Sequence, residues 1–150
     1  WSGLVDRWDH RPMGAGVTMR IIGVMDQGKP ESERLLLKAE SDLDIGHLLV
    51  LCVRMRNDVP TTGIKRVYWF PDKQVQAGDL IVLYTKSGTA TEKKNEDGTT
   101  SHFYYWRLTS PAWGEADDGV VLVESSGWQF QPAVASEQTK LELRTDPTGA

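Results

Sequence analysis

Only one cysteine occurs in the 150 residues, so no disulfide can form within the chain. Cys52 lies in the apolar stretch 48–53, which predicts a buried, inert thiol rather than a nucleophile. No apolar run approaches the roughly 20 residues that a membrane-spanning helix needs. The sequence therefore predicts neither a membrane span nor a thiol-based active site, and the lack of disulfides leaves the cellular compartment open.

Clustered positive charge is also missing. The net charge is -4 and the isoelectric point is about 5.4. The longest basic feature, Lys93 and Lys94, is followed after one residue by Glu96 and Asp97. Proteins that bind nucleic acid through its phosphates need clustered Lys and Arg. We therefore expect no nucleic-acid partner.

Recognisable catalytic motifs are absent as well. The chain has no G-x-S-x-G elbow and no glycine-rich phosphate loop. His10, His47 and His102 are the only histidines, and none has a second His, Cys or carboxylate at the short spacing typical of zinc sites. We therefore expect no catalytic residue, no metal and no cofactor, and a protein that is not an enzyme.

Acidic residues do gather in some loops. Asp42 and Asp44 stand two positions apart, and Asp117 and Asp118 lie beside Glu115. Asp side chains commonly form turns by bonding to nearby backbone groups, whereas calcium sites need several oxygen ligands. We interpret these acids as turn-forming or solvated, and calcium at a loop stays an open alternative.

What the sequence does contain is the pattern of an all-β domain. The aromatic stretch 67–70 ends at Pro71, which cannot donate to a strand ladder, and the turn at Gly78 and Asp79 leads into the apolar run 80–84. Residues 112–130 repeat this order of turn and strand. The Asp97–Gly98 step favours a tight turn in a protruding hairpin. The expected strands are 17–25, 33–39, 48–55, 67–70, 80–84, 89–92, 99–108 and 120–123.

Two further segments are assigned from their composition. Residues 56–65 carry Asn57, Asp58, Pro60 and Gly63, which predicts a loop. Residues 139–144 alternate, with Leu141 and Leu143 on one face, which predicts an edge strand or an arm that docks on a neighbour. We expect an N-terminal arm over 1–15, a β-sandwich of about seven to eight strands over 16–131 and a C-terminal arm over 132–150.

Six tryptophans are available to a core or an interface. Three lie in or beside expected strands and are interpreted as core: Trp69, Trp106 and Trp128. The others lie in irregular segments: Trp1, Trp8 and Trp113. Aromatic side chains bury large areas at protein interfaces, so we expect Trp1, Trp8 and Leu141 to be intermolecular anchors. The expected protein interface also includes Trp113, Tyr104 and Tyr105. The alternative is that the N-terminal arm folds back over its own domain.

A resemblance to a known family follows from several short segments. They are 33–37 (ERLLL), 43–45 (LDI), 69–71 (WFP) with 78–79 (GD), and Trp113 with 118–122 (DGVVL). In this order they resemble the landmarks of the lamin tail domain, over roughly residues 19–131. The chain departs from that pattern at Ala39, where the family usually has Asn, and at His47, where it usually has Trp.

The resemblance implies an immunoglobulin-like β-sandwich that binds or scaffolds and has no catalytic residues. The resulting hypothesis is a structural accessory subunit, such as a decoration or cement protein of a virus capsid. Its partners would be proteins, through self-association or a capsid-like scaffold, and its location a virion or the extracellular space rather than the cytoplasm. Because the sequence starts at Trp1 rather than Met, we expect the true N-terminus to be processed or to lie outside it.

Two other functions remain to be weighed. An adhesion or carbohydrate-binding module of a secreted bacterial protein would stack sugar rings on exposed Tyr104, Tyr105 and Trp113. A flat exposed aromatic platform would favour that function, and arms embedded in neighbouring chains would favour assembly. A small hydrolase would instead need a pocket with converging polar groups and a shifted pKa.

Overall fold

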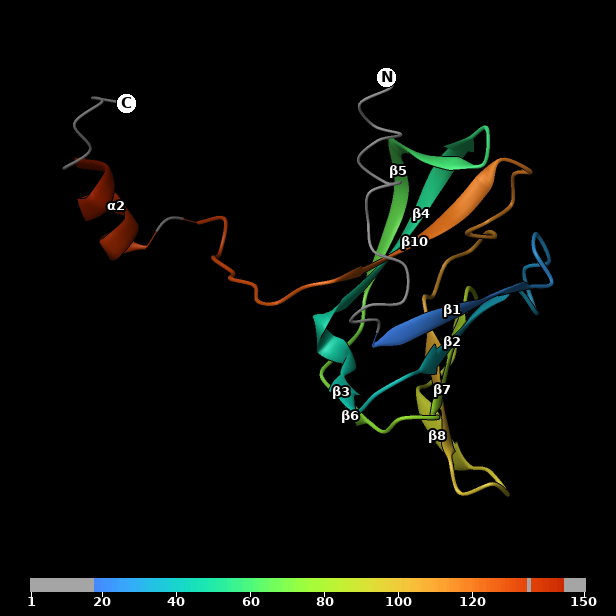
Figure 1. The fold of residues 1–150 in the computed structure, drawn as a ribbon. Coiled ribbons are helices and arrows are strands. Elements are labelled where there is room, and N and C mark those ends of the chain that lie inside the picture. The colour runs from blue at the N-terminus through green and yellow to red at the C-terminus, as the bar shows by residue number, and fades with distance from the viewer. Residues whose placement is uncertain (1–17, 135, 145–150) are drawn as a thin grey trace.

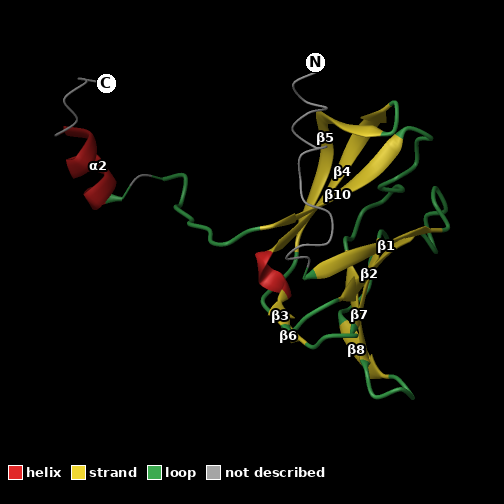
Figure 2. Cartoon of the chain, in the orientation of Figure 1, coloured by secondary structure: helices red, strands yellow, loops and turns green. Residues whose placement is uncertain are grey.

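The chain folds mainly into β-strands that belong to several sheets (Figures 1 and 2). A computed structural model describes residues 18–134 and 136–144. Within these ranges it has ten strands, one 3-10 helix and one α-helix. All eight strands expected from the sequence are present, and the two others, β3 (Leu43–Asp44) and β6 (Gln74–Val75), are only two residues long and pair with each other.

Sheet A has five strands in the order β1-β2-β7-β9-β8. Their bounds are β1 (Met19–Met25), β2 (Arg34–Ala39), β7 (Leu80–Tyr84), β9 (Thr100–Tyr105) and β8 (Thr91–Lys94). Strands β7 and β9 pair in parallel, and the other neighbours are antiparallel. The parallel pair arises because the β8–β9 hairpin places its first strand at the sheet edge and its second strand beside β7.

Sheet C is antiparallel and has three strands, with β4 (Leu48–Arg56) between β10 (Asp118–Glu124) and β5 (Val59–Trp69). The 3-10 helix η1 (Ile45–His47) leads directly into β4. One hydrophobic core receives side chains from both larger sheets, including Leu35 and Leu83 of sheet A and Val50 of sheet C. Alternation along each strand makes this possible, because every second side chain of β2 and of the first part of β4 points into the core.

A buried carboxylate connects distant parts of this core. Glu33 is fully buried and accepts hydrogen bonds from the Thr85 hydroxyl and from the backbone N–H groups of Gly28, Ala112 and Trp113. A buried carboxyl group is tolerated in an apolar interior when hydrogen-bond donors such as these satisfy its oxygens. Glu33 therefore holds the loop around Trp113 against sheet A although the two residues are 80 positions apart.

The expected loop over 56–65 was wrong, because β5 begins at Val59 and includes most of that segment. Strands β4 and β5 are joined by two residues, Asn57 and Asp58, whose φ angles of 53° and 61° both lie in the left-handed region. Two such residues form the type I′ turn that connects antiparallel strands directly. Pro60 is accommodated because it lies at the start of a strand on the edge of the sheet.

The edge strand expected at residues 139–144 was wrong, whereas the alternative, an arm that docks on a neighbour, stays a prediction. The segment is the α-helix α2 (Glu137–Arg144), and Ser136 caps it by accepting a hydrogen bond from the Thr139 N–H at 3.2 Å. Leu141 and Leu143 thus do not share a face, because neighbours on a helix are three or four residues apart. Neither described helix is long and apolar enough to cross a membrane.

Candidate binding surface

The side of sheet C that points away from the core is apolar across all three strands. Cross-strand pairing places Trp69, Leu49 and Val123 in one row, and Val67, Leu51 and Val121 in the next. These six residues, called the outer face here, alternate along their strands with Val50, Cys52, Tyr68, Val120 and Leu122, which belong to the core or pack against it. Antiparallel sheets commonly carry polar side chains on the face opposite the core. The outer face therefore has the composition of a surface that is covered by something.

The exposed part of this face lies on β5, at Val67 and Trp69. Trp69 is about half exposed (49%), and its ring meets that of Trp128 edge to face at a centroid distance of 5.1 Å. Trp128 in turn lies 6.1 Å from the ring of Phe130. The Trp69 indole N–H donates to the Gly46 carbonyl at 2.6 Å, which fixes the orientation of the ring. Three aromatic rings thus form a continuous exposed cluster, the aromatic corner.

Two grooves border the aromatic corner. One, of about 500 Å³, is lined by aromatic residues of the end of β5 together with Pro71, Asp72 and Trp128. The second, of about 160 Å³, lies on the other side of Trp69 and Trp128, against η1 and Ser125. Both are shallow and mostly apolar, with a few polar groups at their margins. Such surfaces suit an extended apolar segment better than a small polar molecule.

Beyond Trp128 the chain runs away from the sheets towards α2 (Figure 1). Its large apolar side chains stay exposed: Phe130 (81%), Val134 (84%), Leu141 (52%) and Leu143 (55%). Helix α2 buries none of its eight residues. Helices of this length are marginal in water unless an apolar face is packed against a partner. Residues 125–134 and 136–144, called the C-terminal segment, therefore present apolar groups that their own domain does not bury.

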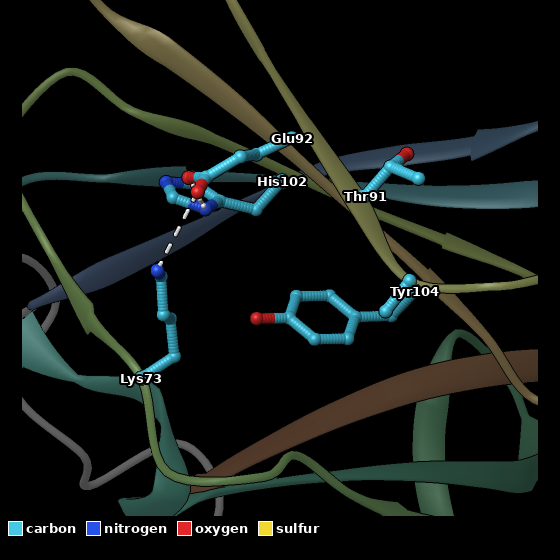
Figure 3. Close-up of a pocket in the computed structure, with 6 residues that line it drawn as sticks. Lys73, Thr91, Glu92, His102 and Tyr104 are labelled. Atoms are coloured by element: carbon cyan, nitrogen blue, oxygen red, sulfur yellow. Dashed lines mark ion pairs between the residues drawn. The ribbon is translucent and has the colours of Figure 1, made fainter.

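A polar pocket of about 180 Å³ lies between β8, β9 and Lys73. His102 is buried there, with Nε2 at 3.0 Å from Asp79 Oδ2 and Nδ1 at 3.5 Å from Glu92 Oε2. Lys73 Nζ lies 3.7 Å from Glu92 Oε1. Figure 3 shows the Tyr104 hydroxyl pointing into the same space as the Lys73 side chain.

Asp79 is the anchor of this polar pocket. Burial by itself raises the pKa of its carboxyl group, but hydrogen bonds from His102 and from the backbone N–H groups of Thr100 and Gln76 lower that pKa below its usual value. An ionised carboxylate can only accept, so His102 Nε2 donates to it. The two nitrogens of His102 thus face two carboxylates, and the ring joins β9 to the turn before β7 and to β8. This arrangement ties strands together and leaves no ring nitrogen facing open solvent.

Cys52 is buried as expected. Its thiol donates a hydrogen bond to the Ala112 carbonyl at 2.9 Å, and burial raises its pKa to about 11. A thiol with that pKa stays protonated at neutral pH and is a poor nucleophile.

The structure divides the six expected interface residues into three groups. Trp1 and Trp8 lie outside the described residues. Leu141 is half exposed on α2. Of the other three, Trp113 is in the core (1% exposed) and Tyr104 is buried, whereas Tyr105 is half-buried and stacks on Tyr84 at 5.5 Å. Trp113 is thus buried within its own domain, where its backbone N–H donates to Glu33.

The aromatic corner was missed by the sequence analysis. Trp69 and Trp128 were interpreted as core residues because they lie in or beside strands, yet each is about half exposed. The available signal was alternation: Phe70 and Tyr68 flank Trp69, so if these two point inward, Trp69 must point outward. The sequence alone does not say which of the two sets faces the core.

The loop acids have ordinary partners in the structure. Asp44 accepts from the backbone N–H groups of Gly46 and Lys73, and Asp42 accepts from that of Ala77. Asp118 pairs with Lys65 at 2.7 Å. Over residues 18–134 and 136–144, no group of three His, Cys, Asp or Glu side chains is arranged to hold a metal ion.

Comparison with known proteins identifies no family. No model of a protein family matches the chain, and no curated protein matches it significantly.

Proposed function

We propose that this protein is a non-catalytic interaction module, most concretely an accessory subunit, such as a decoration or cement protein, that clamps neighbouring subunits of a capsid-like assembly. Its domain would be an immunoglobulin-like β-sandwich of the lamin-tail kind with terminal arms. A core that draws side chains from both larger sheets supports the sandwich. The expected location is a virion or the extracellular space.

The observation that carries the proposal is the apolar surface that the domain leaves exposed. The aromatic corner and the C-terminal segment together present Trp69, Trp128, Phe130, Val134 and Leu143 to solvent. Scattered apolar residues are normal on a protein surface, but contiguous exposed patches mark interaction sites. Aromatic residues in particular dominate the energetics of protein interfaces.

The groups that could support catalysis are occupied by structural contacts. Both nitrogens of His102 face carboxylates, and the Cys52 thiol is buried and protonated. The fully buried Glu33 accepts hydrogen bonds from its own core. These contacts support a structural role for the residues and favour the absence of an enzymatic activity.

The alternative, an adhesion or carbohydrate-binding module, has less support from the geometry. Sugar rings stack on flat, accessible aromatic faces, whereas Trp69 and Trp128 meet at an interplanar angle of 81°. Two of the three residues expected to stack on sugars, Trp113 and Tyr104, are buried. A protein partner fits the angular aromatic corner and its apolar grooves better.

The test is the mass of the full chain in solution by light scattering, with oligosaccharide titrations followed by tryptophan fluorescence. We expect a species larger than the 16.8 kDa monomer. The Phe130→Ala/Val134→Ala and Trp1→Ala/Trp8→Ala double variants should shift it towards the monomer. Saturable oligosaccharide binding by a chain that stays monomeric would overturn the proposal in favour of the carbohydrate-binding module.

A further inference from the structure

We infer that the partner of the outer face is a second copy of this chain, in a two-fold dimer in which each copy's C-terminal segment crosses onto β5 of the other. This inference rests on the proposed function and names its first partner. The proposed function names only protein partners in general, whereas the inference names one surface, the outer face, and one partner, a second copy of the chain. The reasons are the composition of the face, its area and the place where the C-terminal segment leaves the domain.

The outer face contains no charged residue among its six members, which are Leu49, Leu51, Val67, Trp69, Val121 and Val123. A partner that covers it must be equally uncharged, because burying an unpaired charge is costly. A second copy meets this requirement because it presents the same six apolar residues. In a two-fold contact the same patch faces itself, so apolar residues meet apolar residues on both sides.

The area of the face shows that face-to-face packing alone is too small. Three strands spaced about 4.8 Å apart and about seven residues long at about 3.4 Å per residue give roughly 340 Å² per copy. Two copies would bury roughly 700 Å² in total, below the roughly 1,200–2,000 Å² of stable complexes. A stable dimer through this face therefore needs a second element.

The C-terminal segment supplies that element. It leaves the domain at the aromatic corner, where Trp128 touches Trp69 on the outer face. An aromatic side chain buries about 150–250 Å², so the two copies of Phe130 alone would bring the interface to roughly 1,000–1,200 Å². Val134 and Leu143, exposed further along, extend the contact into the range of stable complexes.

The receiving surface on the partner is the outer edge of β5. This strand is at the edge of sheet C and exposes Ile64 and Val67 beside Trp69. An edge strand with apolar side chains is a natural template for another segment of chain. Reciprocal exchange gives each copy the same contacts and closes the assembly at two subunits.

Sedimentation velocity over a wide concentration range tests the surface. We expect a dimer of the full chain whose dissociation constant rises at least tenfold in Val67→Lys. The matched control is Ile22→Lys, a similarly exposed apolar residue on β1 of sheet A, which should change the dissociation constant less than twofold. Near-ultraviolet circular dichroism of each variant verifies that the fold is retained.

A cysteine cross-linking experiment tests the exchange. Val67→Cys protein is mixed with Phe130→Cys protein, so that a disulfide between these positions joins two different chains and gives twice the 16.8 kDa mass. The native thiol is buried and does not compete. Replacing the first partner by Lys94→Cys, at the hairpin tip of sheet A, should abolish the product.

The outcomes separate this inference from the proposed function. A dimer whose dissociation constant is unchanged by Val67→Lys, or that gives no specific cross-link, would overturn the inference. The proposed function would still hold, because the chain would still associate with itself. A chain that remains monomeric at every concentration would overturn the inference, with residues 1–17 or a different protein as the cover of the outer face. For such a monomeric chain, the oligosaccharide titration distinguishes the proposed protein-interaction module from a carbohydrate-binding module.

Discussion

Asp79 shows how much one side chain can organise in this protein. Its Oδ2 atom accepts from His102 and from the Gln76 N–H, and its Oδ1 atom accepts from the Thr100 N–H. The carboxylate therefore joins the turn before β7 to the start of β9. These hydrogen bonds require the ionised form, which is why they lower the pKa of the group despite its burial.

The lowered pKa predicts a pH dependence of stability. A depressed carboxyl pKa stabilises the fold at pH values above the unfolded-state pKa of about 3.8, and this contribution disappears as the pH falls through the folded-state pKa. Asp79→Asn should thus have a clearly lower free energy of unfolding than the wild type at neutral pH. The difference between the two proteins should become smaller below about pH 4. Urea unfolding at several pH values measures this difference. Glu96→Gln, at the exposed hairpin tip, serves as the control. A difference in free energy of unfolding between wild type and Asp79→Asn that stays constant down to about pH 3 would contradict the prediction.

At the scale of elements, the β4–β5 hairpin depends on its two-residue turn. Asp58 has a φ of 61°, in the region where a side chain without a local hydrogen bond is strained. Asp58→Val should lower the free energy of unfolding by about 1–2 kcal/mol, since β-branched residues fit this region poorly. Asp58→Gly should leave it unchanged or raise it, because glycine adopts positive φ at no steric cost. Equal destabilisation by both substitutions, measured by urea unfolding, would show that the side chain rather than the turn geometry matters.

The same hairpin shows where sequence reasoning succeeds and where it stops. Apolar runs such as 80–84 and 48–55 predicted their strands closely, because buried strands carry a strong local signal. Residues 56–65 were interpreted as a loop on account of Asn57, Asp58 and Pro60, although two turn residues between strands are also the signature of a hairpin. Helix α2 was missed because its Leu141 and Leu143 alternate, whereas the Ser136 cap and the helix-forming residues after it carried the correct signal.

The candidate site was harder to predict than the strands. Tyr68, Trp69 and Phe70 are all aromatic, so their sequence does not show which of them faces the core. That choice is made by the pairing of β5 with β4, which sets Trp69 opposite Leu49. Trp113 lies in an irregular segment of the sequence, yet it is buried, with its backbone N–H bonded to Glu33, 80 residues earlier, and its indole N–H bonded to Gly119.

On the scale of the whole molecule, net charge opposes the apolar contacts of the proposed dimer. Each copy carries a charge of -4, so two copies repel each other. The range of this repulsion falls from about 30 Å at 0.01 M salt to about 8 Å at 0.15 M. We therefore expect the dimer dissociation constant to fall several-fold as salt rises between these values, as measured by sedimentation velocity.

A charge variant outside the interface provides the control. Glu96→Lys changes the charge of each copy from -4 to -2, since one negative charge is replaced by one positive charge. The residue lies in the turn between β8 and β9, on sheet A. This variant should dimerise more tightly at low salt and show a weaker salt dependence. Association that weakens as salt is added would instead indicate an interface built on ion pairs.

The order of strands in sheet C has a consequence for the chain while it is being made. Strand β4 is the central strand of that sheet, but β10, which covers one of its edges, begins about 60 residues after β4 ends. At the usual translation rate of about 5–20 residues per second, β4 waits on the order of 3–12 s for this partner. During that interval the nascent chain carries an open apolar edge, so its yield in a cell should depend on chaperones that shield such edges until synthesis is complete.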